Sequence, residues 1–164
     1  MPALPKTAVE AIEMAIAAEL DAQATYLQLA NTTQSQDAKL LYQNLARDEQ
    51  WHKELLDERY QALTGNKQPK SASGGPSIEG AVVRMKAKEN MDEMEILQLA
   101  ISAEIAAFEF YTKTTAAIID PETRTMFLRL SEDEARHRNL LEKEVQARQG
   151  KPTDEMELDN WVRE

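Results

Sequence analysis

Two stretches of this sequence place a glutamate three residues before a histidine, and they constrain the fold more than any other feature. One is Asp48-Glu49-Gln50-Trp51-His52 and the other is Asp133-Glu134-Ala135-Arg136-His137. On an α-helix this spacing puts the carboxylate and the imidazole on one face, about one turn apart. Leucines flank both stretches, and burying such polar groups is unfavourable unless a partner compensates for the lost hydration. A metal ion is such a partner, and helical bundles use Glu-x-x-His to hold pairs of metal ions.

The two stretches belong to a longer internal repeat. When the chain is shifted by the distance from His52 to His137, which is 137 − 52 = 85 residues, identical residues coincide without a gap. The matching positions are Ala15-Ile16, Ala18-Glu19, Ala22, Tyr26, Leu45, Asp48-Glu49, His52 and Leu55-Leu56, against Ala100-Ile101, Ala103-Glu104, Ala107, Tyr111, Leu130, Asp133-Glu134, His137 and Leu140-Leu141. Such a repeat indicates two helical hairpins of one design.

Capping signals and apolar spacing predict one all-α domain over residues 1–164. We expect hairpin 1 at about 8–64, a connection at 65–89 that could include a short helix near 78–88, hairpin 2 at about 90–150, and a short C-terminal helix or tail at 151–164. Thr7 with Glu10 and Asn90 with Glu93 have the spacing of capping boxes, Asp120-Pro121 is typical of a helix start, and Gly65 is typical of a helix end. The content of only 5 glycines agrees with a helical protein.

The glutamates of each predicted hairpin lie at the same height. Glu19 precedes the first bend, near residue 34, by about 15 residues, and Glu49 follows it by about 15, so both lie roughly 22 Å from the turn at 1.5 Å per residue. Glu104 and Glu134 flank the second bend, near residue 119, in the same way. The expected fold is therefore an antiparallel four-helix bundle of two repeated hairpins with a long central connection. Its middle would hold six polar side chains, namely Glu19, Glu49, His52, Glu104, Glu134 and His137.

Four carboxylates and two neutral imidazoles carry a charge of 2 × 0 + 4 × (−1) = −4, which two divalent cations neutralise. Oxygen-rich ligation with one imidazole per metal suits iron or manganese, and zinc also binds such sites. The alternative is a duplicated bundle whose polar layers are salt-bridged and hold no metal. The metal interpretation has the advantage that the chain's only 2 histidines both follow a glutamate by three residues, one repeat apart.

Composition and charge exclude several kinds of partner, location and metal centre. The net charge of −10 argues against nucleic acid and anionic membranes as partners. No apolar run approaches the ~20 residues of a membrane span, and Glu10 and Glu13 interrupt the first apolar stretch, so no signal peptide is expected. The absence of cysteine excludes disulfides and iron–sulfur or rubredoxin-type centres in these residues, and agrees with a cytoplasmic location.

The motifs resemble those of a known family. Glu19-x6-Tyr26, Glu49-x-x-His52, Glu104-x6-Tyr111 and Glu134-x-x-His137 are similar to the diiron site of the ferritin-like superfamily, in particular its rubrerythrin and COG1633-type branch. The resemblance covers the four long helices. It implies a ferritin-like fold and two iron ions, with Glu19 and Glu104 each binding mainly one metal and Glu49 and Glu134 bridging both. His52 and His137 would complete one metal each.

Two departures from the rubrerythrin pattern affect the expected activity. Rubrerythrins proper carry a C-terminal rubredoxin domain with four cysteines, which these residues do not contain. They also have a seventh ligand, a glutamate at the position of Ala107 here, whose repeat counterpart is Ala22; Glu109 would point to a different face. The site therefore looks more like the symmetric four-glutamate, two-histidine centre of bacterioferritin and of diiron oxygenases.

Four further residues are candidates for supporting the ligands. Tyr26 and Tyr111 lie seven residues after a ligand glutamate, and either hydrogen-bond a ligand carboxylate or relay a radical. Asp48 and Asp133 precede the expected bridging glutamates. They either accept an imidazole N–H, as the resemblance of Asp133-Glu134-Ala135-Arg136-His137 to the DExRH motif of diiron monooxygenases suggests, or lie on a solvated face.

Three functions remain open from the sequence. The leading expectation is a diiron or dimanganese oxidoreductase that reacts with O2 or hydrogen peroxide, with no catalytic residue beyond the metal ligands, and is re-reduced by an external electron donor. The second is a ferroxidase or iron-handling protein of the bacterioferritin type. The third is a non-catalytic helical bundle with a vestigial or zinc-filled site. A homodimer or larger homo-oligomer is expected in each case.

Overall fold

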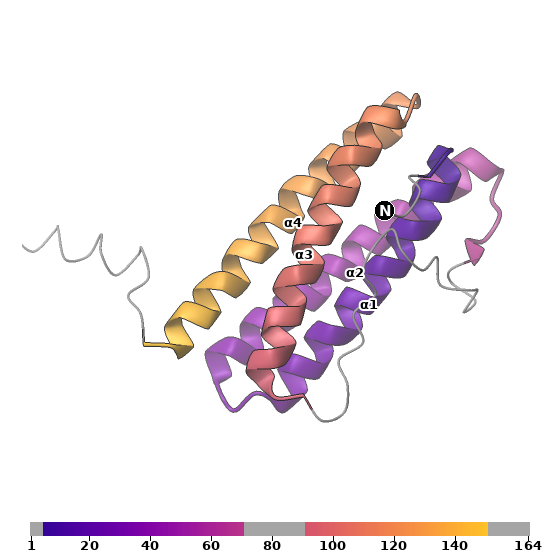
Figure 1. The fold of residues 1–164 in the computed structure, drawn as a ribbon. Coiled ribbons are helices and arrows are strands. Elements are labelled where there is room, and N and C mark those ends of the chain that lie inside the picture. Colours follow the sequence, from indigo (N-terminus) through magenta and orange to yellow (C-terminus); the bar gives the residue numbers. More distant parts are fainter. Residues whose placement is uncertain (1–4, 71–90, 151–164) are drawn as a thin grey trace, which may run out of the picture.

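The computed structural model describes residues 5–70 and 91–150. It consists of four long helices, α1 (Ala8–Thr32), α2 (Gln36–Thr64), α3 (Glu93–Ala117) and α4 (Pro121–Arg148). Figure 1 shows that α1 with α2 and α3 with α4 form two hairpins that lie side by side. The expectation of a four-helix bundle made of two helical hairpins is confirmed. The predicted short helices near 78–88 and in 151–164 lie outside the described residues.

The helix starts follow from side-chain capping, with two corrections to the predicted boxes. Thr7 accepts the Glu10 N–H, but the Glu10 carboxylate accepts the N–H of Lys6 and not that of Thr7, so only half of that box forms. The third helix begins after Asp92, which forms a complete capping box with Glu95, and the predicted start at Asn90 is wrong. The predicted start at Asp120-Pro121 is confirmed, with the Asp120 carboxylate accepting the Thr123 N–H.

Two of the four helices, α2 and α4, are followed by a glycine with a left-handed backbone. Gly65 follows α2 with φ of 69°, as the sequence predicts, and its N–H bonds the Gln61 carbonyl. Gly150 has φ of 68° just beyond α4. A side chain at either position would be strained in this conformation, so glycine allows both helices to stop cleanly.

Two apolar clusters fill the two ends of the bundle and leave its middle to polar groups. One joins the start of α1 to the end of α3 and includes Ile12, Ile16, Leu56, Phe110, Phe127 and Leu130. The other joins the end of α1 to the start of α3 and includes Leu29, Tyr42, Leu45, Ile96, Leu97 and Leu141. Each such buried side chain contributes about 1.5–3 kcal/mol relative to exposure. The two clusters thus hold a polar layer at mid-height that would not be stable alone.

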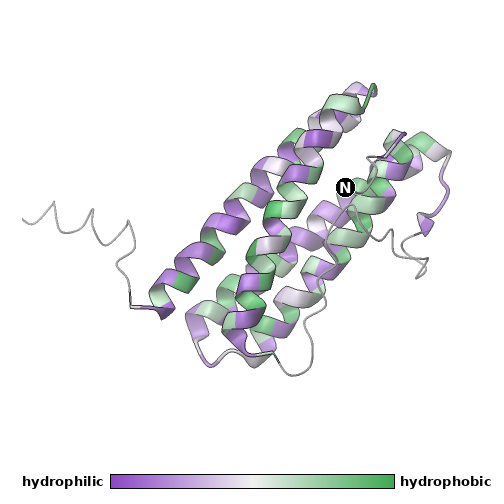
Figure 2. Cartoon of the chain, in the orientation of Figure 1, coloured by the Kyte–Doolittle hydropathy of each residue, from purple (hydrophilic) through white to green (hydrophobic). Residues whose placement is uncertain are grey.

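Figure 2 shows the amphipathic pattern behind this arrangement, with hydrophobic and hydrophilic residues alternating along each helix. Ion pairs close the bundle at its ends: Arg59 of α2 lies 2.6 Å from Asp120 at the α3–α4 turn, and Arg148 of α4 lies 2.6 Å from Glu93 of α3. Among the described residues, none of the four helices is both long and apolar enough to cross a membrane.

Candidate metal centre

Six polar side chains from all four helices meet in the layer between the apolar clusters. Helix α1 supplies one glutamate, α2 a glutamate and a histidine, α3 one glutamate, and α4 a glutamate and a histidine. Each is between 0 and 3% exposed. They are Glu19, Glu49, His52, Glu104, Glu134 and His137, the six residues that the sequence predicts as metal ligands.

The six side chains form two overlapping sets of ligand atoms. Glu19, Glu49, His52 and Glu134 make one set, and Glu49, Glu104, Glu134 and His137 make the other, with all ligand atoms of a set within 4.8 Å of one another. Glu49 and Glu134 belong to both. The geometry therefore has the arrangement that two neighbouring metal ions with two shared carboxylates would need.

Both histidines turn the same nitrogen towards the carboxylates. His52 Nδ1 lies 3.4 Å from Glu19, 3.1 Å from Glu49 and 3.3 Å from Glu134. His137 Nδ1 lies 3.0 Å from Glu49, 3.3 Å from Glu134 and 3.8 Å from Glu104. The rings are stacked with centroids 5.5 Å apart. Each carboxylate set is thus completed by one imidazole.

The other nitrogen of each histidine faces an aspartate of the opposite hairpin. His52 Nε2 lies 3.3 Å from Asp133, and His137 Nε2 lies 3.2 Å from Asp48. An aspartate that accepts Nε2–H leaves Nδ1 with its lone pair towards the carboxylates, which is the tautomer that metal binding requires. Arg136 lies 2.9 Å from Asp133 and 3.6 Å from Asp48, so it connects the two pairs.

The two tyrosines also reach across the bundle. The Tyr26 hydroxyl donates to Glu104, and the Tyr111 hydroxyl donates to Glu19. Both rings are 1% exposed. Each tyrosine therefore holds the glutamate of the other hairpin, not the one that precedes it in its own helix.

The charges of the cluster depend on one another. Burial, and then the negative charges of Glu134 and Glu49, raise the pKa of Glu19 well above its ordinary value. Burial and the charge of Glu134 do the same to the pKa of Glu104. Burial alone would lower the pKa of His137, but Glu134 and Glu49 outweigh it and raise that pKa to about 11. Burial opposes ionisation of Glu49 as well, yet His137 and His52 lower its pKa. Without a cation, protons take up part of the negative charge.

The chemistry of the donor set fits two divalent cations. Among the described residues, Oε1 of Glu49, Oε1 of Glu134 and Nδ1 of His137 are buried without a well-formed hydrogen bond. Oε1 of Glu49 faces Nδ1 of His137 at 3.0 Å, and Oε1 of Glu134 faces Nδ1 of His52 at 3.3 Å. Such atoms are costly to bury unless something coordinates them. They belong to the two shared carboxylates and to one imidazole, which are the groups that a pair of cations would contact.

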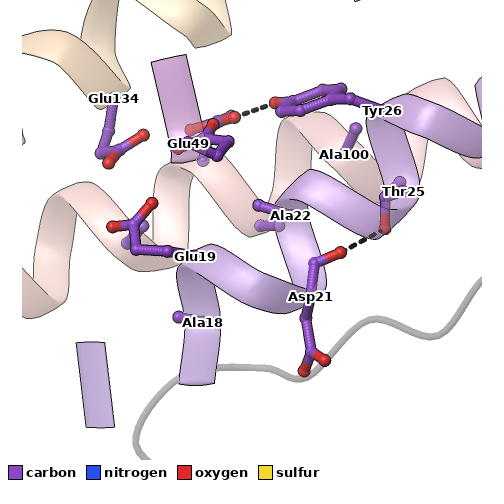
Figure 3. A pocket seen from close by; sticks show the side chains of 12 residues that line it. Ala18, Glu19, Asp21, Ala22, Thr25, Tyr26, Glu49, Ala100 and Glu134 are labelled. Atoms are coloured by element: carbon purple, nitrogen blue, oxygen red, sulfur yellow. Dashed lines mark hydrogen bonds between the residues drawn. The ribbon is translucent and has the colours of Figure 1, made fainter. Parts of the chain in front are cut away.

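Sequence reasoning named Arg136 only as part of a motif and did not anticipate its contacts with both aspartates. The repeat counterpart of Arg136 is Trp51, so the 85-residue comparison hides the arginine. Trp51 lies at the surface, 37% exposed, with the Arg129 guanidinium 4.6 Å from its ring. Ala107, at the position of the seventh rubrerythrin ligand, and its repeat counterpart Ala22 line a small cavity beside the carboxylates, together with Ala18 and Ala103. Figure 3 shows Ala18 and Ala22 there. Glu109 is exposed and paired with Lys113 at 2.7 Å, away from the cluster.

The fold and the cluster define a class of protein, the ferritin-like four-helix bundle with a buried dimetal site of carboxylates and histidines. Within that class, the chain belongs to the Rubrerythrin family, whose model matches residues 10–92 and 95–162. No curated protein matches the sequence significantly.

Solved structures share the fold. A hypothetical protein from Pyrococcus furiosus has a TM-score of 0.72 at 23% identity, with 92% of this chain and 100% of that chain covered. An uncharacterised COG1633 protein from Magnetospirillum magnetotacticum MS-1 has a TM-score of 0.63 at 22% identity, over 88% of this chain and 95% of that one. KatB, a manganese catalase from Anabaena PCC7120, has a TM-score of 0.68 at 19% identity, over 94% of this chain and 78% of that one.

Proposed function

We propose that this protein is a dimetal oxidoreductase that reacts with dioxygen or hydrogen peroxide and is re-reduced by an external electron donor. The observation that supports this most is the pair of ligand sets that share Glu49 and Glu134. Shared carboxylates hold two metal ions close enough to act on one small molecule together. Membership of the Rubrerythrin family supports the same function.

Iron is the metal we propose, with manganese or zinc as substitutes. Carboxylate oxygens with one imidazole per ion suit iron and manganese. When bound, two ferrous ions would supply the two electrons that, with two protons, reduce hydrogen peroxide to two water molecules. Since the chain contains no cysteine, those electrons would return from a separate donor and not from a rubredoxin-type centre in these residues.

The chain's own residues would hold and orient the ligands. Glu19, Glu49, His52, Glu104, Glu134 and His137 would bind the ions. Tyr26 and Tyr111 would fix the two terminal glutamates through their hydroxyls, and Asp133 and Asp48 would fix the imidazole tautomers. Surrounding apolar clusters would keep bulk water from the centre.

Anaerobic loading with Fe²⁺ followed by rapid mixing with hydrogen peroxide or O2 tests this proposal. We expect two irons per chain and oxidation much faster than that of free Fe²⁺. The double variant Glu49→Gln, Glu134→Gln should lose both, while Glu109→Gln, an exposed glutamate of α3, should retain both. Oxidation no faster than free iron would refute the redox function. Uptake of many irons per chain into a large oligomer would indicate iron storage instead.

A further inference from the structure

Trp51 is a residue at which the two repeats differ beside the candidate metal centre. It directly precedes His52, and its repeat counterpart Arg136 directly precedes His137. Arg136 pairs with the aspartates behind the imidazoles. The Trp51 ring instead lies against the imidazole of His52, with ring centroids 5.8 Å apart and an interplanar angle of 53°. The two halves therefore place an aromatic ring before one candidate ligand and a cation before the other.

The Trp51 ring connects the surface with both ligand sets. Trp51 is 37% exposed, whereas His52 is 0% exposed. The imidazoles of His52 and His137 are stacked with centroids 5.5 Å apart, and each belongs to a different ligand set. Tyr26 and Tyr111, which also contact the cluster, are 1% exposed and do not reach the surface. A series of neighbouring rings thus leads from the surface through Trp51 to both candidate metal positions.

A buried metal pair must receive its electrons through the protein. Electron tunnelling slows steeply as the separation between donor and acceptor grows, and conjugated rings in contact mediate it better than empty space does. The exposed part of Trp51 brings the outer end of the ring series to a place that a partner protein can touch. The indole can act there as a bridge, without changing its own oxidation state.

Two arginines flank the exposed ring. The Arg129 guanidinium lies 4.6 Å from the Trp51 ring centroid, within the range of a cation–π contact that holds the indole in place. Arg47 precedes Trp51 by four residues on α2, so the two are neighbours on the helix surface. Both arginines are exposed, and neither forms an ion pair within the described residues. In a chain with a net charge of −10, these cations mark this surface as one that attracts an acidic partner.

The surface beside Trp51 is hollowed along α2 and α4. A groove of about 590 Å³ has Leu55, one turn beyond Trp51, and Arg129 in its lining. It also contains two glutamates, but one of them, Glu122, is already paired with Arg59. Complexes that transfer electrons are weak and bury little area. The exposed ring, its arginines and the near end of the groove are therefore enough surface for a transient complex.

We propose that a small acidic protein that carries one electron docks over Trp51, Arg47 and Arg129, and that its electrons reach the candidate metal centre through the rings of Trp51 and His52. This rests on the proposed function, which supplies the metal pair and its need for an external donor. In each encounter the carrier loses one electron and one ferric ion becomes ferrous, so two encounters restore the ferrous pair. No bond forms or breaks in Trp51.

Docking is tested with oxidised flavodoxin, a small acidic flavoprotein whose reduced form gives up single electrons. The Zn²⁺-loaded Trp161→Phe protein retains Trp51 as its only tryptophan, so one indole N–H signal in the NMR spectrum reports on it. We expect flavodoxin to shift this signal, and added salt to reduce the shift. Arg129→Glu and Arg47→Glu should each weaken docking about tenfold. Arg124→Glu, which changes an exposed arginine on a different side of α4, should leave docking unchanged.

Electron transfer is measured separately, by mixing the ferric protein with reduced flavodoxin and following the flavin semiquinone by absorbance. Trp51→Leu should slow this step severalfold, and Trp51→Phe, which retains a ring, should recover much of the rate. Both variants should still bind two Mn²⁺ per chain in calorimetry, because Trp51 is not a ligand. A purely structural role for Trp51 would instead weaken metal binding and leave the rate of the fully loaded protein unchanged.

These readouts separate the two proposals. If the parent binds no metal pair, or its iron is oxidised no faster than free Fe²⁺, the proposed function fails. If the iron chemistry is intact but flavodoxin leaves the Trp51 signal in place, or the Trp51→Leu protein is reduced at the parent rate, only the electron-entry proposal fails. Equal weakening of docking by Arg124→Glu and Arg129→Glu would also overturn it, because total charge and not this surface would then decide binding.

Discussion

Replacing Tyr111 by phenylalanine removes one hydroxyl from the edge of the candidate metal centre and leaves the ring in place. The hydroxyl donates to Oε1 of Glu19, while Oε2 of the same carboxylate faces His52 Nδ1 at 3.4 Å. Tyr111 therefore binds Oε1, the Glu19 oxygen that does not face His52, and so orients Oε2 towards the proposed metal. Since the ring is 1% exposed, water cannot readily replace the lost donor.

Two effects of different size follow from this geometry. Leaving a buried acceptor unpaired should lower the free energy of unfolding of the metal-free protein by about 1–3 kcal/mol. A ligand carboxylate without its supporting donor should bind metal about 10- to 100-fold more weakly, which corresponds to about 1.4–2.7 kcal/mol. Urea denaturation measures the first effect, and calorimetric titration with Mn²⁺, which avoids oxidation during the experiment, measures the second.

Tyr60→Phe is the matched control. Tyr60 is also buried, at 4% exposed, and its hydroxyl donates to Glu13 at 2.8 Å, outside the cluster. This variant should lose stability while its affinity for Mn²⁺ stays unchanged. If Tyr111→Phe binds Mn²⁺ as tightly as the parent, or if Tyr60→Phe weakens binding equally, the argument that Tyr111 acts on a metal ligand is refuted.

Further predictions concern the aspartates. Asp133→Asn should weaken Mn²⁺ binding about tenfold. Asp48→Asn should weaken it less, because the Asp133 side chain is 20% exposed and that of Asp48 is 42% exposed. Calorimetry that finds the reverse order would contradict the proposed role of these contacts. At the α3–α4 turn, hydrogen bonds from Thr123 and then Arg59 lower the pKa of Asp120 from 3.8 to about 2. A depressed pKa stabilises the fold above the unfolded-state value, and that contribution is lost as pH falls from about 4 towards 2. Asp120→Asn should therefore lower the free energy of unfolding by about 1 kcal/mol near pH 6. In urea titrations, this difference in stability between variant and parent should shrink as the pH falls from about 4 to about 2. A difference that does not change with pH would show that the charge of Asp120 contributes nothing.

The fold and the meeting of the six polar residues could be predicted because both depend on spacing along the chain. Helical periodicity and the 85-residue repeat determine which residues share a face and a height, and the hairpins then bring these faces together. That the six residues bind metal is still a prediction, which their arrangement supports but does not test.

The crosswise partners could not be predicted because they depend on how the two hairpins face each other. Spacing places Tyr26 two turns from Glu19 on the same helix, yet its hydroxyl reaches Glu104 of α3. Asp133 likewise contacts His52, in the other hairpin, and not His137. Each half of the repeat thus supports the ligands of the other half, which is a property of their packing.

The start of α3 shows a different limit. The sequence contains two overlapping capping boxes, Asn90 with Glu93 and Asp92 with Glu95, and local rules rank them equally. In the structure the Glu93 carboxylate accepts a hydrogen bond from Arg148 of α4 at 2.6 Å, and the helix start is capped by Asp92 and Glu95 instead. A contact between distant residues therefore decides between two equivalent local signals.

The most direct test of a metal pair at the shared carboxylates is anomalous scattering from crystals grown with Mn²⁺. We expect two peaks about 3.5–4 Å apart in the middle of the bundle, one beside His52 Nδ1 and one beside His137 Nδ1, with Glu49 and Glu134 touching both. The Glu49→Gln, Glu134→Gln protein should show neither peak. Peaks only at the surface, or a parent protein without any peak between the histidines and the carboxylates, would contradict the account.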